Sequence, residues 1–312
     1  MKSGIICKFQ GGLGNQMFQY AAARALQEKL GGANRVALKF DARAFTQGPK
    51  DDTLRKLEIQ KFNTKVELAV DSELREYFST GSTFLDKVRR RLAPFLNSSK
   101  VYKEPHFEFD KNFFSLNAPR YFEGYFQSEK YFSQISDALF SEFQLLAPLP
   151  PEIEKWASLI QTQNSCFVHI RRGDYLKPEV RNYHGGCTPL YYESSIELIA
   201  SKEPDTRFYF FSDDAQWTEQ TFSHLKNAEF VKHPYGHEPQ FDMYLMSLCS
   251  KAIMANSSFS WWSVWLSKMR KHPFSRVIIA PEHWFRSTQN KTHDLYSNDW
   301  IKRDNWAGGF EV

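Results

Sequence analysis

Short apolar segments alternate with amphipathic helical patterns along the second half of the chain, and this alternation is the strongest constraint on its fold. One helical pattern places Phe241, Tyr244, Leu245 and Leu248 on a single face. We expect strands at 166–170, 208–211, 229–231, 252–254 and 277–279, and helices at 152–160, 191–200, 218–225, 241–248 and 260–269. Alternating strands and helices predict a parallel sheet with helices on both faces.

The first half of the chain opens with a strand–loop–helix–strand pattern. An apolar strand at 4–9 runs into a glycine-rich turn at 10–16. A helix follows and is expected to end at Gly31-Gly32, before a second strand at 36–40. A strand at 121–126 and a helix at 135–143 are also expected. This opening is typical of a βαβ unit, so both halves are expected to be α/β.

A proline-rich joint marks the expected domain boundary. The chain has 312 residues, a length that suggests about two domains. Pro148-Leu149-Pro150-Pro151 fits neither a helix interior nor a central strand. We therefore predict domains at 1–147 and 148–312. Ligands of open parallel sheets bind outside the carboxyl ends of the strands, so residues just after strands are the candidates for a site.

Composition and charge exclude several classes of protein. The chain is 42% hydrophobic and 24% charged, which indicates a packed core rather than disorder. A formal net charge of +4 is well short of the concentrated basic face typical of nucleic-acid binding. No apolar run approaches the roughly 18 residues that span a bilayer, and the amino terminus lacks a signal-peptide pattern. We expect a cytoplasmic protein.

The four cysteines and the histidines show no metal-binding spacing. Cys7, Cys166 and Cys249 lie in apolar segments, and Cys187 is isolated from them in sequence. Free thiols are therefore expected, and a zinc site is not.

A basic amphipathic stretch covers residues 85–96 and includes Lys87 and Arg89–Arg91. A solvated helix face is one interpretation of this stretch. Peripheral contact with an anionic membrane surface, such as the inner membrane, is the other.

The glycine loop after the first strand departs from the dinucleotide fingerprint. Gly12 and Gly14 match its first two glycines, but Met17 occupies the position of the third. One interpretation is a tight strand-to-helix turn. The other is a loop whose backbone N–H groups, together with the amide of Asn15, face an anion or a sugar.

The sequence His169-Ile170-Arg171-Arg172-Gly173-Asp174 ends an apolar strand. Two arginines at such a place require an anion or a carboxylate. The guanidinium fork suits phosphate. A purely structural alternative is that Asp174 neutralises one arginine, which leaves the other unexplained.

Three further polar groups follow strands or begin helices. Asn256-Ser257-Ser258-Phe259 precedes a helix, where it would cap the helix or offer hydroxyls and N–H groups to phosphate. Asp213 and Asp214 would hold ribose hydroxyls, fix an arginine, or start a turn. Asp242 would complement a helix dipole or accept hydrogen bonds from the N–H edge of guanine.

The chain has no Asp-x-Asp triplet to grip a divalent cation on a diphosphate, so no metal and no other cofactor is expected. Two arginines and a helix terminus would neutralise a departing diphosphate instead.

Together these motifs resemble the bacterial α-1,2-fucosyltransferases of glycosyltransferase family 11. The resemblance rests on the glycine motif at 11–20, the double-arginine motif at 169–174, Ser-Asp-Asp at 212–214, and the motif at 256–262. It extends in order from about residue 5 to about residue 285. It implies a GT-B fold, in which two Rossmann-like domains face across a cleft, with the acceptor on the N-terminal side and GDP-β-L-fucose held mainly by the C-terminal half. It also implies a metal-independent, inverting transfer to the 2-hydroxyl of a terminal galactose, as in O-antigen assembly.

The resemblance further implies roles for single residues. Arg171 corresponds to the arginine that contacts the β-phosphate, and Asp242 to the acid that contacts guanine. The segment Ser257–Phe259 corresponds to the phosphate contact. Asn15 corresponds to an asparagine near the sugar and the leaving group. The other residues of the same motifs are placed with the donor site: Gly12, Gly14, His169, Arg172, Asp213, Asp214 and Asn256.

The general base that takes the proton from the acceptor hydroxyl is not identified by sequence; Asp174 is one candidate. Several alternatives to an α-1,2-fucosyltransferase remain open. They are a fucosyltransferase of another linkage such as α-1,6, an NAD-dependent oxidoreductase, and a non-catalytic nucleotide- or sugar-binding protein.

Overall fold

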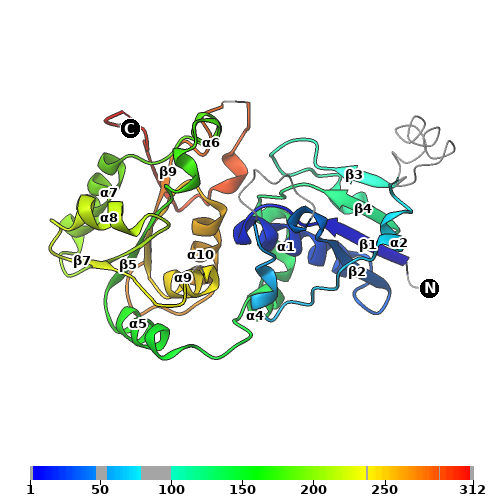
Figure 1. Ribbon diagram of the computed structural model, residues 1–312, viewed down its shortest axis with the longest axis horizontal. Coiled ribbons are helices and arrows are strands. Elements are labelled where there is room, and N and C mark those ends of the chain that lie inside the picture. The colour runs from blue at the N-terminus through cyan, green and yellow to red at the C-terminus, as the bar shows by residue number, and fades with distance from the viewer. Residues whose placement is uncertain (1–2, 47–54, 79–99, 237, 288, 310–312) are drawn as a thin grey trace. The chain divides into compact units, whose positions relative to one another are not determined.

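A computed structural model describes residues 3–46, 55–78, 100–236, 238–287 and 289–309. The chain divides into two compact units. The first contains Met1–Gln144 and His293–Leu295, and the second contains Leu145–Thr292 and Tyr296–Val312. Each unit has its own sheet with helices packed on it (Figure 1). This is the pair of α/β domains that the sequence predicts.

The first unit is built on a parallel sheet with the strand order β2-β1-β4-β3. Its strands are β1 (Ser3–Lys8), β2 (Val36–Asp41), β3 (Val101–Lys103) and β4 (Arg120–Glu123). Its helices are α1 (Leu13–Lys29), α2 (Asp71–Leu74) and α4 (Ser136–Glu142), with 3-10 turns at Arg43–Phe45, Ile59–Lys61, Phe113–Ser115, Glu129–Tyr131, Ser133–Ile135 and His293–Leu295. The predicted βαβ opening is confirmed, whereas the three-residue strand β3 was not predicted.

Helix α1 lies in the core of the first unit and carries buried polar groups that tie it to other elements. Arg24 forms a 3.0 Å ion pair with Glu142 of α4, and the Tyr20 hydroxyl donates to the same carboxylate at 2.7 Å. Gly31, with φ of +107°, ends the helix in a conformation that other residues rarely adopt. Because a buried charge is costly without a partner, Arg24 fixes α1 against α4.

The segment His293–Leu295 belongs to the first unit although it lies far along the chain. Asp294 accepts a 2.9 Å hydrogen bond from the Phe109 amide and pairs with Lys130. The division therefore differs from the boundaries at 1–147 and 148–312 in two places. Residues 145–147 fall in the second unit, and these three later residues return to the first.

The second unit is built on a parallel sheet with the order β10-β9-β8-β5-β6-β7. Its strands are β5 (Ser165–Ile170), β6 (Arg207–Ser212), β7 (Ala228–Phe230), β8 (Lys251–Ile253), β9 (Val277–Pro281) and β10 (Ile301–Arg303). Its helices are α5 (Pro151–Thr162), α6 (Pro178–His184), α7 (Pro189–Lys202), α8 (Ala215–Phe222), α9 (Pro239–Ser247) and α10 (Ser258–Lys268), with a 3-10 turn at Asp174–Leu176. All the strands and helices predicted for this half are present, and α6 and β10 are additional.

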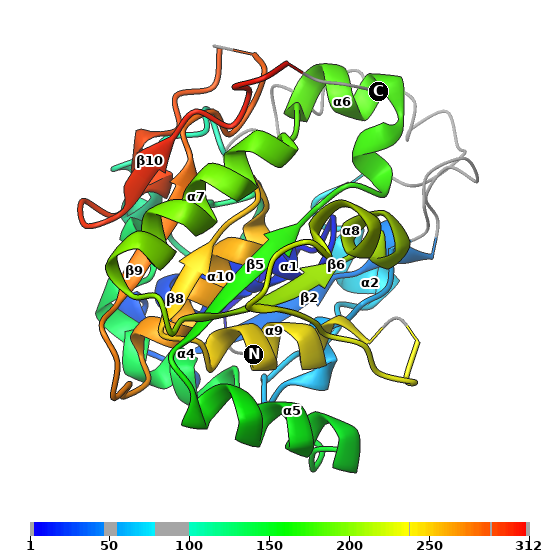
Figure 2. The ribbon, with the colours of Figure 1, turned by 90° about the vertical axis from the view of Figure 1, so that its left-hand side faces the viewer.

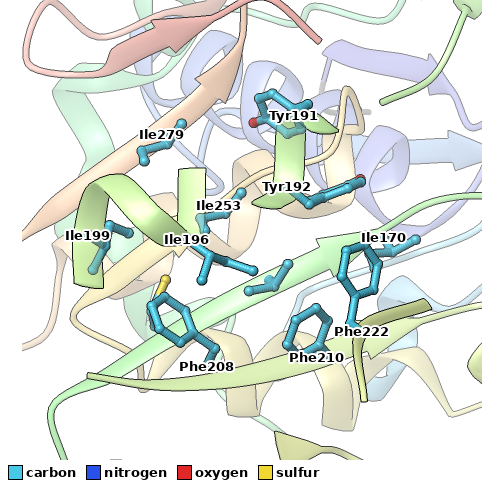
Figure 3. Packing of buried hydrophobic residues seen from close by; sticks show 12 residues of the cluster. Ile170, Tyr191, Tyr192, Ile196, Ile199, Phe208, Phe210, Phe222, Ile253 and Ile279 are labelled. Carbon is cyan, nitrogen blue, oxygen red and sulfur yellow. The ribbon is translucent and has the colours of Figure 1, made fainter. Parts of the chain in front are cut away.

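Strand β5 lies at the centre of this sheet and is buried along its whole length. Cys166, Val168 and Ile170 pack against α7 and α8 on one face, in a cluster that includes Tyr191 and Phe222 (Figure 3). Helices α9 and α10 lie on the other face (Figure 2). Burial on both faces explains why this strand is mostly apolar, with only Ser165 and His169 polar, and shows no alternation of buried and exposed residues.

All four cysteines are free thiols, and Cys7, Cys166 and Cys249 are buried, as expected. Within the described ranges, no helix is both long enough and apolar enough to cross a membrane. The basic stretch at 85–96, with Lys87 and Arg89–Arg91, lies entirely within residues 79–99, outside the described residues.

Candidate functional site

The register of two neighbouring strands brings the double-arginine motif to the Ser-Asp-Asp motif. Ile170, the last residue of β5, pairs with Ser212, the last residue of β6. The next residues along each strand are Arg171 and Asp213, which therefore leave the sheet side by side. Residues just after these two strands, which the sequence singles out as candidates for a site, therefore lie next to each other.

Asp213 holds Arg171 and also the backbone that follows it. Its Oδ2 lies 2.8 Å from the Arg171 guanidinium, and its Oδ1 accepts the amides of Arg172 at 2.8 Å and Gly173 at 3.0 Å. A Cβ at position 173 would lie 3.0 Å from Oδ2, so glycine suits this close approach. The Arg171 and Asp213 side chains are 21% and 22% exposed, so the pair is accessible to a ligand.

Arg172 pairs with a different carboxylate. Its Nε lies 3.1 Å from Asp214, and its guanidinium lies 4.4 Å from the centre of the Trp217 ring. Asp214 also caps α8 by accepting the Trp217 amide at 3.2 Å. Of the three interpretations offered for Ser-Asp-Asp, the structure therefore shows that these acids fix arginines and start a helix.

Asp174 was considered both as an arginine partner and as a general base. The carboxylates observed beside the two arginines are Asp213 and Asp214. Asp174 begins a 3-10 turn, and its side chain lies outside the described residues.

His169 is a buried imidazole beneath the arginine loop. Its Nδ1 lies 2.5 Å from the Ser260 hydroxyl, and its ring lies 5.3 Å from that of Phe259. Burial, with a contribution from the nearby charge of Arg171, lowers the pKa of His169 to about 3. The imidazole is therefore neutral at physiological pH and connects β5 to α10.

The segment after β8 forms the amino terminus of α10. Ser257 caps the helix by accepting the Phe259 amide at 3.2 Å, and Ser258 is its first residue. Ser257, Ser258 and Phe259 are all half-buried. The partial positive charge of a helix amino terminus favours an anion at this position.

Asn256 has a different place from its neighbours. Its side-chain amide donates to the backbone carbonyls of His184 at 2.9 Å and Trp284 at 3.1 Å. The backbone carbonyl of Asn256 accepts a 2.9 Å hydrogen bond from the Tyr175 hydroxyl. Because these amide donors are used within the protein, Asn256 positions the loops around the site rather than presenting its donors to a ligand.

Asp242 lies in the first turn of α9 and is partly exposed. Its Oδ1 is 3.2 Å from Nε2 of His233, whose side chain is largely covered and which lies three residues after β7. This hydrogen bond raises the pKa of His233. The rest of the carboxylate can accept hydrogen bonds from a ligand.

The glycine loop of the first unit is held by side chains of α1. Gly11 has φ of +79°, and a Cβ there would lie 2.5 Å from the Asn15 side chain. Gly12 caps α1, and a Cβ at Gly12 would meet nothing within 4 Å, so its backbone can be approached. Gly14 is buried in the helix, and Asn15 Oδ1 accepts from Gln127 at 2.7 Å. Met17, in place of the third fingerprint glycine, is fully buried in the core.

Sequence reasoning missed two residues of these sites, Trp217 and Gln127. Trp217 lies three positions after Asp214, where an aromatic residue in the first turn of a helix can cover a charge at the strand end. Gln127 follows β4 and carries no motif, so only the strand order β1-β4 connects it with Asn15.

A cavity of about 470 Å³ adjoins the arginine loop within the second unit. Its walls include Arg171, Arg172, Tyr175, Arg181 and Trp217. This volume is in the range that holds small ligands. The described residues contain no group of three or more His, Cys, Asp or Glu side chains that could hold a metal ion.

Three features lie at the carboxyl edge of the second unit's parallel sheet. They are Arg171 held by Asp213, the amino terminus of α10, and the partly exposed carboxylate of Asp242. This combination defines an α/β protein with a site suited to a phosphate-bearing ligand such as a nucleotide.

Comparison with known proteins specifies the class. The model of the family described as Glycosyl transferase family 11 matches residues 4–304. The O-antigen biosynthesis glycosyltransferase WbnK of Escherichia coli is 31% identical over 316 residues, covering 93% of this chain and 97% of that protein. The α-1,2-colitosyltransferase of Escherichia coli is 29% identical and covers 96% of this chain and 98% of that protein. The chain therefore belongs to glycosyl transferase family 11.

Among solved structures, fucosyltransferase NodZ from Bradyrhizobium is 16% identical with a TM-score of 0.43, covering 84% of this chain and 92% of that one. Heptosyltransferase WaaC of Escherichia coli, solved with ADP, is 10% identical with a TM-score of 0.41, covering 96% and 92%.

Proposed function

We propose that this protein transfers L-fucose from GDP-β-L-fucose to the 2-hydroxyl of a terminal galactose, with inversion and without a metal, in the synthesis of a surface glycan such as O-antigen. The observation that carries the proposal is the anchored Arg171 at the end of β5, in a chain matched by the family model from residue 4 to residue 304. The names of the two Escherichia coli relatives support O-antigen as the product and α-1,2 as the linkage.

In this proposal the second unit holds the donor. Arg171 binds the β-phosphate, and the amino terminus of α10 at Ser257–Phe259 faces the same diphosphate. Asp242 accepts hydrogen bonds from the guanine N–H edge. Cleavage of the fucosyl–phosphate bond places extra negative charge on GDP, which a fixed guanidinium stabilises more in the transition state than in the ground state.

The first unit holds the galactose-terminated acceptor in this proposal. The open space beside Gly12 allows a ligand to approach the backbone, and Asn15, oriented by Gln127, positions a hydroxyl or a phosphate oxygen. An amide does not take a proton at neutral pH, so Asn15 cannot be the base.

A second donor is favoured by one observation, the 29% identity to an α-1,2-colitosyltransferase. Colitose is the 3-deoxy analogue of fucose, so both sugars would be carried by the same kind of activated donor. The distinction depends on a single hydroxyl, and a donor comparison decides it.

The test is a transfer assay with purified protein, GDP-fucose or GDP-colitose, and a β-galactoside acceptor. We expect an α-linked fucose on the galactose 2-hydroxyl, identified by NMR of the product. A 3- or 6-linked product would overturn the linkage, and transfer only from GDP-colitose would overturn the donor.

A thermal-shift panel of GDP, UDP, NAD and ATP tests the nucleotide independently. A ligand at 100 times its Kd stabilises the folded state by roughly 2.7 kcal/mol. Stabilisation by NAD rather than GDP would favour the oxidoreductase alternative. Stabilisation by GDP without any transfer would favour a binding protein.

A further inference from the structure

One carboxylate at the edge of the first sheet belongs to no motif. Glu104 directly follows β3, so it lies at the carboxyl edge of the sheet. Strand β4 lies between β3 and β1, and the glycine loop with Asn15 follows β1 at the same edge (Figure 1). Glu104 therefore follows β3 and Asn15 follows β1, and only β4 lies between these two strands.

The hydrogen bonds of Glu104 fix one oxygen more firmly than the other. Its Oε2 accepts the amides of Tyr125 at 2.8 Å and Phe126 at 3.1 Å. Its Oε1 has a longer contact, 3.3 Å, with the Tyr131 hydroxyl. Since each carboxylate oxygen has two lone pairs, Oε1 retains the capacity to take a proton. The residue is half-buried rather than enclosed.

The segment bound by Glu104 has an unusual backbone. Phe126 has φ of +53°, in the left-handed region that is strained for a bulky residue. A Cβ at Gly124 would lie 2.6 Å from the Glu104 Cβ and 2.8 Å from its Oε2, so this approach requires glycine. Strain of this kind is concentrated at functional sites, where the surrounding structure maintains it.

The same segment connects Glu104 to the glycine loop. Gln127 Nε2 donates to Asn15 Oδ1 at 2.7 Å. Gln127 is only 7% exposed, and its Oε1 is buried with no hydrogen-bond partner among the described residues. An unpaired buried acceptor is costly. The Gln127 Oε1 acceptor belongs to the segment whose amides bind Glu104 and whose Gln127 binds Asn15.

We propose that Glu104 is the general base that removes the proton from the acceptor hydroxyl. This inference rests on the proposed function. As the hydroxyl proton moves to Glu104 Oε1, the oxygen lone pair forms the bond to fucose C1. The bond from C1 to the β-phosphate oxygen breaks, and its electron pair leaves with GDP. Glu104 then releases the proton to solvent.

The surroundings of Glu104 suit this role. Burial raises the pKa of its carboxyl, opposed by the two amide hydrogen bonds, the Tyr131 hydroxyl and the charge of His106. Tyr102 and Cys7 are the other titratable groups that interact with it. A higher pKa makes a stronger base at neutral pH.

Other acids near this edge are already engaged. Glu123 forms a 2.8 Å ion pair with Lys8, and Asp41 forms a 2.7 Å ion pair with Arg43. Asp110 accepts the Tyr102 hydroxyl at 2.7 Å and the Asn112 amide at 2.9 Å. Although burial raises the pKa of Asp41, the hydrogen bonds from Arg43 outweigh it and lower that pKa, so Asp41 is a weaker base.

The decisive variant is Glu104→Gln, because its amide oxygen can still accept the two backbone amides. We expect kcat to fall by about 100- to 10,000-fold, with an unchanged melting temperature and GDP affinity. We expect the wild type to show an acidic limb in its pH–rate profile, and this limb should disappear in Glu104→Gln. Glu123→Gln is the matched control and should keep that limb and a rate within a few-fold of wild type.

Near-normal kcat in a folded Glu104→Gln protein overturns the proposal, as does a reduced rate that retains the acidic limb. If Glu104→Gln does not fold, Glu104→Asp is measured instead. A reduced rate with a shifted acidic limb supports the base, and wild-type rate with an unshifted limb overturns it. Failure of the wild type to transfer fucose would contradict the proposed function, not the assignment of Glu104 alone.

Discussion

Asp213 binds Arg171 through one carboxylate oxygen and the two backbone amides that follow Arg171 through the other. The side chain and the loop backbone are thereby held by a single acid. An arginine fixed in this way keeps its orientation without a bound ligand, which is the condition for electrostatic stabilisation of a transition state.

Replacement of Arg171 by lysine should reduce catalysis more than binding. Lysine keeps the charge but loses the planar fork that fits both Asp213 and a phosphate. We expect Arg171→Lys to fold normally and to lose about two to three orders of magnitude in kcat. GDP affinity should fall less, since the interaction strengthens as the bond breaks. Initial rates, GDP affinity and melting temperature test this.

Arg172→Lys is the matched control for that variant. It keeps the charge near Asp214 but loses the stacking on Trp217, which contributes about 0.5–1 kcal/mol at exposed sites. We expect a small loss of stability and a milder loss of rate. A well-folded Arg171→Lys enzyme with near-normal kcat would refute the role of Arg171 at the leaving group.

Asp242 should determine the preference for guanine. Asp242→Ala removes an acceptor for the base N–H edge, and an unpaired polar edge costs about 1–3 kcal/mol. GDP binding should weaken and the preference for GDP over ADP should narrow, as measured by titration calorimetry. Equal affinities of wild type and variant for both nucleotides would remove Asp242 from the site.

The buried His169 should make stability depend on acid pH. Its folded pKa is lowered to about 3, whereas an unfolded histidine titrates near 6.5. Between pH 3 and pH 6.5 the unfolded state therefore binds more protons than the folded state. The contribution of His169 to the free energy of unfolding is present above pH 6.5 and is lost as the pH falls toward 3.

The variant His169→Asn tests this, because it can keep the hydrogen bond to Ser260 without titrating. Its unfolding free energy should decline less than that of the wild type on acidification below pH 6.5. Parallel curves for the two proteins would show that His169 is not responsible.

Transfer should not need a metal ion, because Arg171 and the amino terminus of α10 are proposed to neutralise the diphosphate. Initial rates in excess EDTA should equal those in Mg²⁺. A large loss in EDTA that added Mg²⁺ or Mn²⁺ restores would contradict this and would require carboxylates beyond those considered at the site.

The central elements were predictable, since a fully buried strand such as β5 and a patterned helix such as α9 carry their own signals. The edge strands β3 and β10 are three residues long and end in basic residues, so neither stands out as an apolar run. The pairing of Arg171 with Asp213 spans two motifs whose proximity depends on the register of β5 and β6. Glu104, proposed above as the base, belongs to no sequence motif, because its place at this edge depends on β3.

The return of His293–Leu295 to the first unit limits how such proteins can be recombined. Exchanging only residues 1–144 with those of a relative would separate Asp294 from the Phe109 amide and Lys130. Because the first unit is proposed to bind the acceptor, a chimaera designed to change the acceptor has to transplant two discontinuous pieces of sequence. Genetic swaps at a single crossover point would instead create mismatched hybrids, whose failure would reflect lost anchoring rather than altered specificity.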